Sequence, residues 1–228
     1  MAVRHFTPAL FEFLFDLDVH NERAWFEANR ERFERDVREP MLRFIADLQQ
    51  PLRTVSPHLV ADPRRQGGSM FRIHRDTRFA RDKRPYKTWV AAQFRHELAR
   101  DVHAPGFYLH MEPGNVHAGA GIWRPDPETL RTLRDALVDR AAAWRRVQAG
   151  AWRDAGWELG GESLKTAPRG YPADHPLIED LRRKDLVASR PFTEEDVTSP
   201  GFLERYVDSC RRALPFMRFL CRAVGVPF

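Results

Sequence analysis

Apolar residues between positions 1 and 50 recur at helical spacing. Thr7-Pro8 favours a helix start, because the hydroxyl can cap the first turn and proline fits within it. An apolar face follows over residues 10–17, and a second apolar stripe runs over residues 26–48 at intervals of about 3.6 residues. Asn21 could cap this second helix, and Pro40 should kink or restart it. The N-terminal segment is therefore predicted to be helical.

From residue 67 onward the hydrophobic pattern shortens to that of β-strands. Residues 69–75 and 89–96 are short and mixed enough to be strands. Residues 107–112 and 116–123 alternate between apolar and polar positions on either side of Pro113-Gly114. This alternation around a turn is typical of a β-hairpin.

One face of the predicted hairpin has little side-chain bulk. Successive side chains of a strand point to opposite faces, so a tight turn places the apolar positions together. The other face then carries Tyr108, His110, His117, Gly119 and Gly121. Glycine at alternate positions of one face indicates that a packed helix or a ligand approaches the backbone there.

Helical periodicity returns in the C-terminal half, over residues 126–148, 176–184 and 199–223, with an extended piece at 186–192. Residues 158–176 are rich in glycine and proline and should form a loop or a short irregular pair of strands. Helices, then clustered strands, then helices predict an α+β fold. We expect a mixed or antiparallel sheet of about four to six strands, packed by the N-terminal and C-terminal helices.

Length and composition favour one globular domain that spans residues 1–228. The hydrophobic fraction of 43% is that of a globular protein rather than of a disordered chain. No apolar run approaches the roughly 18–20 residues that a membrane span needs, so we expect no membrane association. Cys210 and Cys221 lie roughly 16 Å apart along one predicted helix, too far for a disulfide. Two unpaired thiols favour a cytoplasmic location.

The positive charge of the chain is concentrated in one stretch. The net charge is +5, yet residues 64–100 alone hold eleven Arg or Lys against three Asp or Glu. Residues 72–87, RIHRDTRFARDKRPYK, contain seven of these cations and two of the acids. A cluster of this kind attracts negative charge and indicates where the function is located.

The spacing RxxRDxRFxxxKxPYK over residues 72–87 resembles the signature of the domain-of-unknown-function 2461 family, a bacterial family of similar length. Three further segments resemble the same family: Trp25-Phe26, the Pro113-Gly114 hairpin with Gly119 and Gly121, and residues 164–176 with Leu164-Lys165, Arg169-Gly170-Tyr171 and Asp174-His175-Pro176. The resemblance covers nearly the whole chain and implies a single domain. It implies no particular activity.

The cations of residues 72–87 form the first candidate binding site. Arginine presents a planar fork that suits phosphate and carboxylate groups, and lysine a compact charge. Asp76 alone cannot neutralise five neighbouring cations, so we expect a basic pocket for a small anionic ligand such as a phosphorylated molecule. Loop 164–175 repeats the composition and either folds over the same site or braces the fold. The candidate ligand-binding residues are Arg72, Arg75, Asp76, Arg78, Lys83, Tyr86, Lys87, Lys165, Arg169 and Tyr171.

The sequence leaves open whether the protein is an enzyme, and it assigns no catalytic residue. If a reaction occurs at the motif, the candidate chemical groups are Asp76, Lys83, Tyr86 and Lys87. Cations around Tyr86 would favour its phenolate, so that Tyr86 could donate or accept a proton.

Two other interpretations of the motif compete with a small-molecule pocket. The basic segment could bind nucleic acid by contacting phosphates, with the interleaved aromatic residues Phe71, Phe79, Tyr86 and Trp89 stacking on bases. This alternative is less favoured, because the cations do not line one helix and no familiar nucleic-acid-binding element is visible. In the third interpretation, the motif braces a structural or partner-binding domain.

No metal or cofactor is predicted from the sequence. Histidines 96, 103, 110 and 117 recur every seven residues, and His110 and His117 could face each other across the hairpin. Without a nearby carboxylate or a cysteine set, these imidazoles make a poor metal site. The chain also has no paired-cysteine zinc pattern, P-loop or serine nucleophile elbow. The oligomeric state is not specified by the sequence.

Overall fold

A five-stranded antiparallel sheet lies at the centre of the protein, with its strands in the order β1-β2-β3-β5-β4. The structure is a computed structural model that describes residues 2–98 and 105–228. The strands are β1 (Val90–Arg95), β2 (Gly106–Glu112), β3 (Asn115–Ile122), β4 (Glu158–Leu159) and β5 (Leu186–Phe192). The predicted α+β class and the predicted hairpin are both confirmed.

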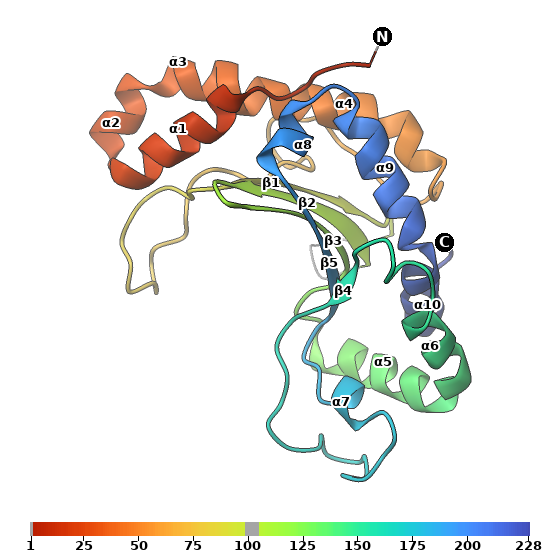
Figure 1. Cartoon of the computed structure of the whole chain (residues 1–228). Helices are drawn as coiled ribbons and strands as arrows, with labels where there is room; N and C mark the ends of the chain where they lie inside the picture. Colours follow the sequence, from red (N-terminus) through yellow and green to blue (C-terminus); the bar gives the residue numbers. More distant parts are fainter. Residues whose placement is uncertain (1, 99–104) are drawn as a thin grey trace.

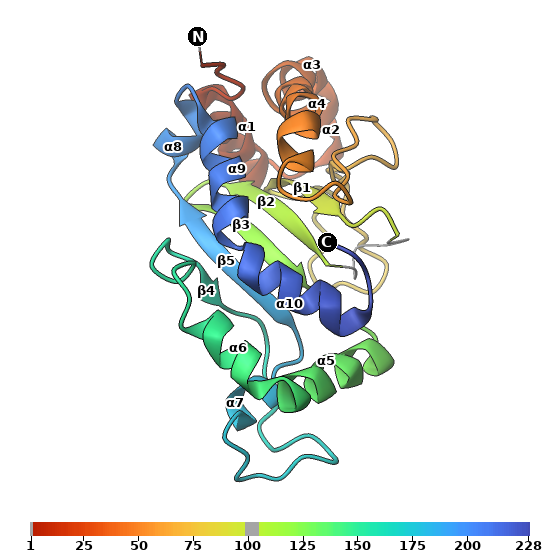
Figure 2. The ribbon, with the colours of Figure 1, turned by 90° about the vertical axis from the view of Figure 1, so that its right-hand side faces the viewer.

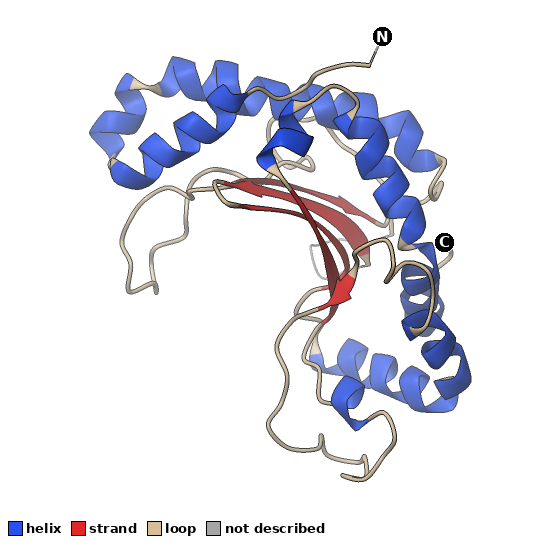
Figure 3. Ribbon diagram, in the orientation of Figure 1, coloured by secondary structure: helices blue, strands red, loops and turns tan. Residues whose placement is uncertain are grey.

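Helices from both ends of the chain cover one side of the curved sheet (Figures 1 and 3). Figure 2 shows α9 and α10 crossing in front of the strands on that side. The helices are α1 (Pro8–Val19), α2 (Arg23–Ala28), α3 (Arg30–Phe33), the π-helical η1 (Glu34–Arg38), α4 (Glu39–Arg53), α5 (Pro127–Asp139), α6 (Ala141–Gln148), α7 (Ile178–Leu181), α8 (Glu194–Thr198), α9 (Phe202–Arg212) and α10 (Leu214–Val224). None of the described helices is long and apolar enough to span a bilayer.

The hydrophobic core lies between the sheet and these helices. The apolar positions of the hairpin, which include Phe107, Leu109 and Met111, are fully buried, as are Phe216 and Leu220 of α10. Each large side chain of this kind stabilises the fold by about 1.5–3 kcal/mol when it is buried. The alternation in β2 and β3 therefore fixes which face of the sheet packs inward and which face stays open.

Several predicted elements are shorter or more broken than their periodicity suggested. Residues 69–75 form isolated bridges to neighbouring segments instead of a strand. The helix expected over 176–184 is limited to α7. The helix over 126–148 breaks at Arg140, where φ is −118° and ψ is 35°. The helix over 199–223 breaks at Ala213, because Pro215 lies in the first turn of α10 and has no N–H to continue α9.

The predicted restart around Pro40 is confirmed, because the chain forms the π-helical turn η1 before α4, and Pro40 lies in the first turn of α4. The predicted capping role of Asn21 is wrong, since α2 begins at Arg23 and its N-cap is Glu22. The amide of Asn21 instead pairs with the backbone of Tyr86: its Nδ2 donates to the carbonyl at 3.1 Å, and its Oδ1 accepts from the N–H at 3.0 Å. Asn21 therefore ties the basic motif to the N-terminal helices.

Candidate functional site

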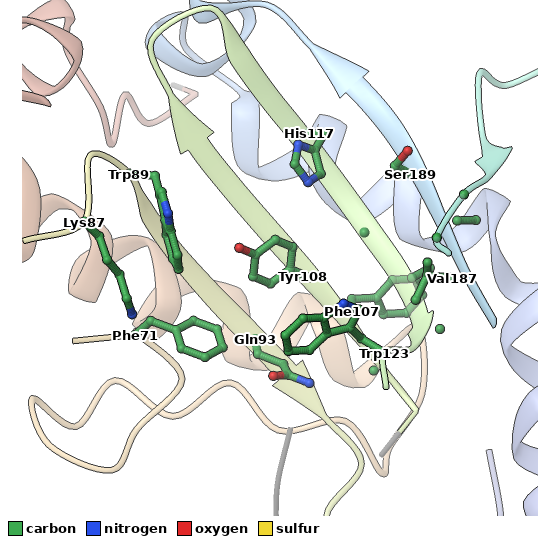
Figure 4. Close-up of a pocket in the computed structure, with 17 residues that line it drawn as sticks. Phe71, Lys87, Trp89, Gln93, Phe107, Tyr108, His117, Trp123, Val187 and Ser189 are labelled. Atoms are coloured by element: carbon green, nitrogen blue, oxygen red, sulfur yellow. The ribbon is translucent and has the colours of Figure 1, made fainter. Parts of the chain in front are cut away.

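The open face of the sheet contains a cavity of about 530 Å³ (Figure 4). Its walls come from the end of the basic motif, from β1, β2 and β3, from β5, and from Gly160 and Gly161, which follow β4. The lining residues are Phe71, Lys87, Trp89, Gln93, Gly106, Phe107, Tyr108, His117, Gly119, Ala120, Gly121, Trp123, Gly160, Gly161, Val187, Ala188 and Ser189. Aromatic and small residues dominate this lining, so the cavity is mainly apolar.

A row of paired residues crosses the sheet and forms the floor of the cavity. Gln93 pairs with Tyr108, Tyr108 with Gly119, and Gly119 with Ser189. A Cβ atom on Gly119 would lie 3.1 Å from the Cβ atom of Tyr108. The missing side chain therefore leaves room for the Tyr108 ring to lie along the floor.

Gly121 allows β5 to pack closely against β3. Its φ is +123°, and a Cβ atom there would lie 2.1 Å from the carbonyl oxygen of Leu186. The glycine thus permits the close approach of β5, where the sequence predicted a packed helix or a ligand. Both glycines line the cavity, so the face that carries them is the open face.

Lys87 is held between two aromatic rings at one end of the cavity. Its Nζ lies 4.5 Å from the Trp89 ring centroid and 5.4 Å from that of Phe71, and it donates to the carbonyl oxygen of Arg72 at 2.9 Å. Burial lowers the pKa of Lys87, and the charge of Arg72 lowers it further. Within the described part of the chain, no carboxylate forms an ion pair with this ammonium.

A hydrogen-bonded chain of three side chains follows β2 beside Lys87. Tyr108 Oη lies 2.9 Å from His110 Nδ1, and His110 Nε2 lies 3.4 Å from Glu112 Oε2. These residues occupy alternate positions of one strand and therefore share a face. The carboxylate of Glu112 also accepts from Thr88 at 3.1 Å and from Asn115 at 3.0 Å.

Neighbouring rings fix the orientation of His110. His117 of β3 stacks on it at a centroid distance of 4.8 Å and an interplanar angle of 19°, and Trp89 packs at 5.1 Å. The predicted facing of His110 and His117 is confirmed. The expectation that no carboxylate lies near these histidines is wrong, because Glu112 is two residues from His110 on the same strand face and pairs with it. His103, from the same spacing, lies outside the described residues. The described residues contain no group of three or more His, Cys, Asp or Glu arranged to hold a metal ion.

Burial sets the protonation of this cluster. It lowers the pKa of His117 to about 4, helped by the neighbouring His110, and it lowers that of His110 against the opposing effect of Glu112. Burial also raises the pKa of Tyr108. Burial would raise the pKa of Glu112 too, but hydrogen bonds from Asn115, His110 and Thr88 outweigh it and lower the pKa. The cluster at neutral pH is therefore a phenol, two neutral imidazoles and a carboxylate.

The side chains at the centre of the basic motif contact one another. Arg75 pairs with Asp82 at 2.6 Å, Arg78 with Asp76 at 2.7 Å, and Lys83 Nζ donates to a backbone carbonyl of the same loop at 3.0 Å. Hydrogen bonds from Arg78 lower the pKa of Asp76 to about 2. These contacts organise a loop that projects from the sheet, drawn in yellow in Figure 1.

The structure separates the ten residues that the sequence predicted as one site. All ten are described, and Lys87 alone lines the cavity. Tyr86 is buried with its ring stacked on Phe26 at 4.2 Å. Burial also raises the pKa of Tyr86, which opposes the phenolate expected from the sequence. Anion binding by the exposed cations of the motif stays a prediction.

Loop 164–175 does not bring its candidate residues to the cavity. Lys165 and Arg169 are exposed. The hydroxyl of Tyr171 donates to Asp135 of α5 at 2.7 Å, and burial together with this contact raises the pKa of Tyr171 to about 12. The neighbouring Gly160 and Gly161 do line the cavity. The observed contact of Tyr171 is thus that of a residue that braces the loop.

The side chains of this candidate site that sequence reasoning did not select are Tyr108 and Glu112, together with the wall residue Trp123. Positions 108, 110 and 112 carry three polar residues on one face of a predicted strand, which was the available signal. The prediction placed the binding site at residues 72–87 because their charge is the strongest signal in the sequence, and most of these residues lie in the exposed loop. The hydrogen bonds from Tyr108 to His110 and from His110 to Glu112 run along β2 itself and could not be inferred from charge.

Comparison with known proteins identifies one family. The sequence profile described as "Conserved hypothetical protein (DUF2461)" matches residues 9–219. No curated protein and no solved structure matches the chain.

Proposed function

The chain belongs to the DUF2461 family, and from the geometry of its open sheet face we propose that it binds a small molecule with a flat apolar body and one anionic group. The observation that carries this proposal is the ammonium of Lys87, held by two aromatic rings at the end of an apolar cavity. The ligand is still the anionic small molecule that the sequence predicts. We now expect it to bind at Lys87, the last residue of the motif, and not at the exposed loop.

The size and lining of the cavity favour a flat apolar ligand. A volume of about 530 Å³ lies within the range of roughly 300–1,000 Å³ for small-molecule sites. Phe71, Trp89 and Tyr108 surround one end, with ring centroids of neighbouring pairs 6.1–6.3 Å apart. Trp123 borders the cavity and is 50% exposed, so a ligand would remove apolar surface from water.

The surroundings of Lys87 favour a negative charge on that ligand. An ammonium has three donors, and the carbonyl of Arg72 takes one of them. Partial burial strengthens the attraction of the remaining N–H groups for an anion, because the effective dielectric constant is lower than in water. The carboxylate of the cluster, Glu112, accepts from His110, Thr88 and Asn115, and no ion pair joins it to Lys87 within the described residues.

Calorimetric titration of three matched probes tests the proposal. Benzoate and phenyl phosphate carry an anion on the ring, whereas benzyl alcohol is neutral. We expect both anions to bind about tenfold or more tightly than the alcohol. The Lys87→Gln variant should lose this preference, and Lys83→Gln, which changes an exposed motif lysine, should retain it. Equal loss in the two variants, or equal binding of all three probes, would contradict the proposal.

A second candidate function is nucleic-acid binding by the projecting loop, and one observation favours it. Phe79 is 95% exposed, with the guanidinium of Arg78 5.9 Å from its ring centroid. An aromatic ring beside cations can stack on an unpaired base. Binding of single-stranded DNA that is lost in Phe79→Ala and falls steeply with salt would support this function. Binding only in the micromolar range or weaker at physiological salt, unchanged by the substitution, would reject it.

A further inference from the structure

We propose that Tyr108, backed by His110 and Glu112, exchanges a proton with the ligand in this cavity and catalyses the keto–enol interconversion of a 2-oxo acid that carries a flat apolar group. This inference rests on the proposed function, because it requires the ligand to be bound there. It adds an activity and a substrate class to the binding site.

The position of the phenol carries the first step of the argument. Tyr108 lines the cavity, and in Figure 4 its hydroxyl points toward Trp89, on the same side as Lys87. A carboxylate held by Lys87 would therefore place the adjacent carbonyl group, and the C–H bonds of the carbon next to it, near this hydroxyl. The phenol would then touch the reacting atoms, as a catalytic residue must.

The second step is the direction of the hydrogen bonds behind the phenol. The ionised Glu112 can only accept, so His110 donates to it from Nε2. The neutral imidazole then has a lone pair on Nδ1, which accepts from Tyr108 Oη at 2.9 Å. Both protons of this hydrogen-bonded row, that of the phenol and that of the imidazole, thus point away from the cavity toward Glu112. The phenol oxygen therefore faces the cavity with a free lone pair, as is required of a group that removes a proton from a ligand.

The third step is that the imidazole is held in place. His117 and Trp89 pack on its ring, and Glu112 is itself held by Thr88 and Asn115. A base whose partners are already oriented needs little reorganisation when charge develops. His110 and Glu112 act through Tyr108 and are positioning residues.

The proposed proton transfer balances without another reactant. The C–H bond next to the carbonyl breaks, and its proton passes to Tyr108 Oη as the phenol proton passes to His110 Nδ1. The electron pair of the C–H bond forms the C=C bond, and the carbonyl π pair moves to oxygen. The product is an enolate beside an imidazolium that Glu112 stabilises. Return of the proton to oxygen gives the enol, and return to carbon restores the keto form.

The charge of the site selects the substrate class. Lys87 and the nearby Arg72 favour the carboxylate and also the negative charge that develops on the enolate oxygen. A 2-oxo acid with an aromatic group combines this anion, an acidic C–H and a flat apolar body. Phenylpyruvate has all three features and is the probe of choice.

Exchange of the C3 protons of phenylpyruvate in D₂O, followed by proton NMR, tests the inference, with binding measured separately by calorimetry. We expect the wild type to accelerate exchange at least about tenfold over buffer. Tyr108→Phe should abolish the acceleration while its affinity for phenylpyruvate changes by less than about threefold. Tyr171→Phe removes a hydroxyl that is likewise a hydrogen-bond donor, to Asp135, but lies outside the cavity, and this variant should behave as the wild type.

The positioning role of Glu112 has its own readout. The groups that face His110 are Tyr108 and Glu112 from its own strand and His117 from β3. Glu112→Gln removes the negative charge that favours the imidazolium, so kcat should fall with KM nearly unchanged. The acid limb of the rate profile should also move to lower pH. A purely structural role would leave the position of that limb unchanged and would overturn this part of the inference.

The outcomes separate the two proposals. Phenylpyruvate that binds without accelerated exchange overturns the inference and leaves the binding function intact. Accelerated exchange that persists in Tyr108→Phe also overturns it. Failure of phenylpyruvate, benzoate and phenyl phosphate to bind contradicts the proposed function itself, and the inference falls with it.

Discussion

At the scale of single residues, the basic motif divides into three kinds of position. Arg75, Arg78 and Asp76 form ion pairs within an exposed loop, where such pairs contribute little to stability. Tyr86 is a core residue, and Lys87 reaches the cavity. Their proximity in sequence predicted a single site. In the structure, different residues of the motif lie in the core, in the projecting loop and on the open face of the sheet.

The core role of Tyr86 leads to a stability prediction. Tyr86→Ala should lower the free energy of unfolding by about 3–5 kcal/mol, because it leaves a cavity beside Phe26. Tyr86→Phe keeps the ring and should change the free energy of unfolding by less than about 1.5 kcal/mol. Phe79→Ala, a change at the exposed motif aromatic, should be nearly neutral. Urea denaturation measures all three, and similar losses in the Ala variants would contradict this assignment.

At the scale of elements, the sequence predicted the hairpin because alternation and the Pro113-Gly114 turn are both local signals. The breaks at Arg140 and Ala213 were missed, since amphipathic periodicity continues across both positions. Residues 69–75 looked like a strand but form only isolated bridges. The cavity could not be predicted from the sequence, because it requires β5 to pair with β3 beside Gly119. Such long-range pairing leaves no local pattern.

The close approach of β5 makes Gly121 the most constrained glycine of the hairpin. Gly121→Ala places a Cβ atom 2.1 Å from the Leu186 carbonyl oxygen and should cost more than about 3 kcal/mol in the free energy of unfolding. Gly114→Ala is the matched control, because Gly114 also has a positive φ, of +73°, but nothing lies within 4 Å of its Cβ position. It should cost only about 1–2 kcal/mol. Thermal and urea melts that rank the two variants equally would contradict the role of Gly121.

At the scale of the whole molecule, one cluster of buried residues joins the N-terminal helices, the sheet and the C-terminal helices. This continuity supports the single domain predicted from the sequence, which a single cooperative unfolding transition would test. The helices bury one face of the sheet and leave the cluster of Tyr108, His110 and His117 on the other. The cavity therefore lies on the sheet face opposite the packed helices, with His117 in its lining.

The pH dependence of stability follows from the imidazoles. His117 has a pKa of about 4 in the folded protein, below its usual value of 6.5, so the unfolded chain binds more protons between these values. Stability should be complete above this window and fall by about 1–3 kcal/mol as pH drops through it. His117→Asn should show a smaller fall, with the remainder due in part to His110. Urea melts at pH 7 and 4.5 measure this difference, and equal falls in both proteins would contradict it.

The central claim is that the cavity on the open sheet face, and not the projecting loop, holds the anionic ligand. A crystal soaked with 4-bromobenzoate tests it directly, because anomalous scattering locates the bromine. We predict a bromine peak inside the cavity, with the carboxylate within hydrogen-bond distance of Lys87 Nζ and no such peak in crystals of Lys87→Gln. A peak at the projecting loop over residues 75–84, or a cavity without ligand when calorimetry shows saturation, would contradict the account.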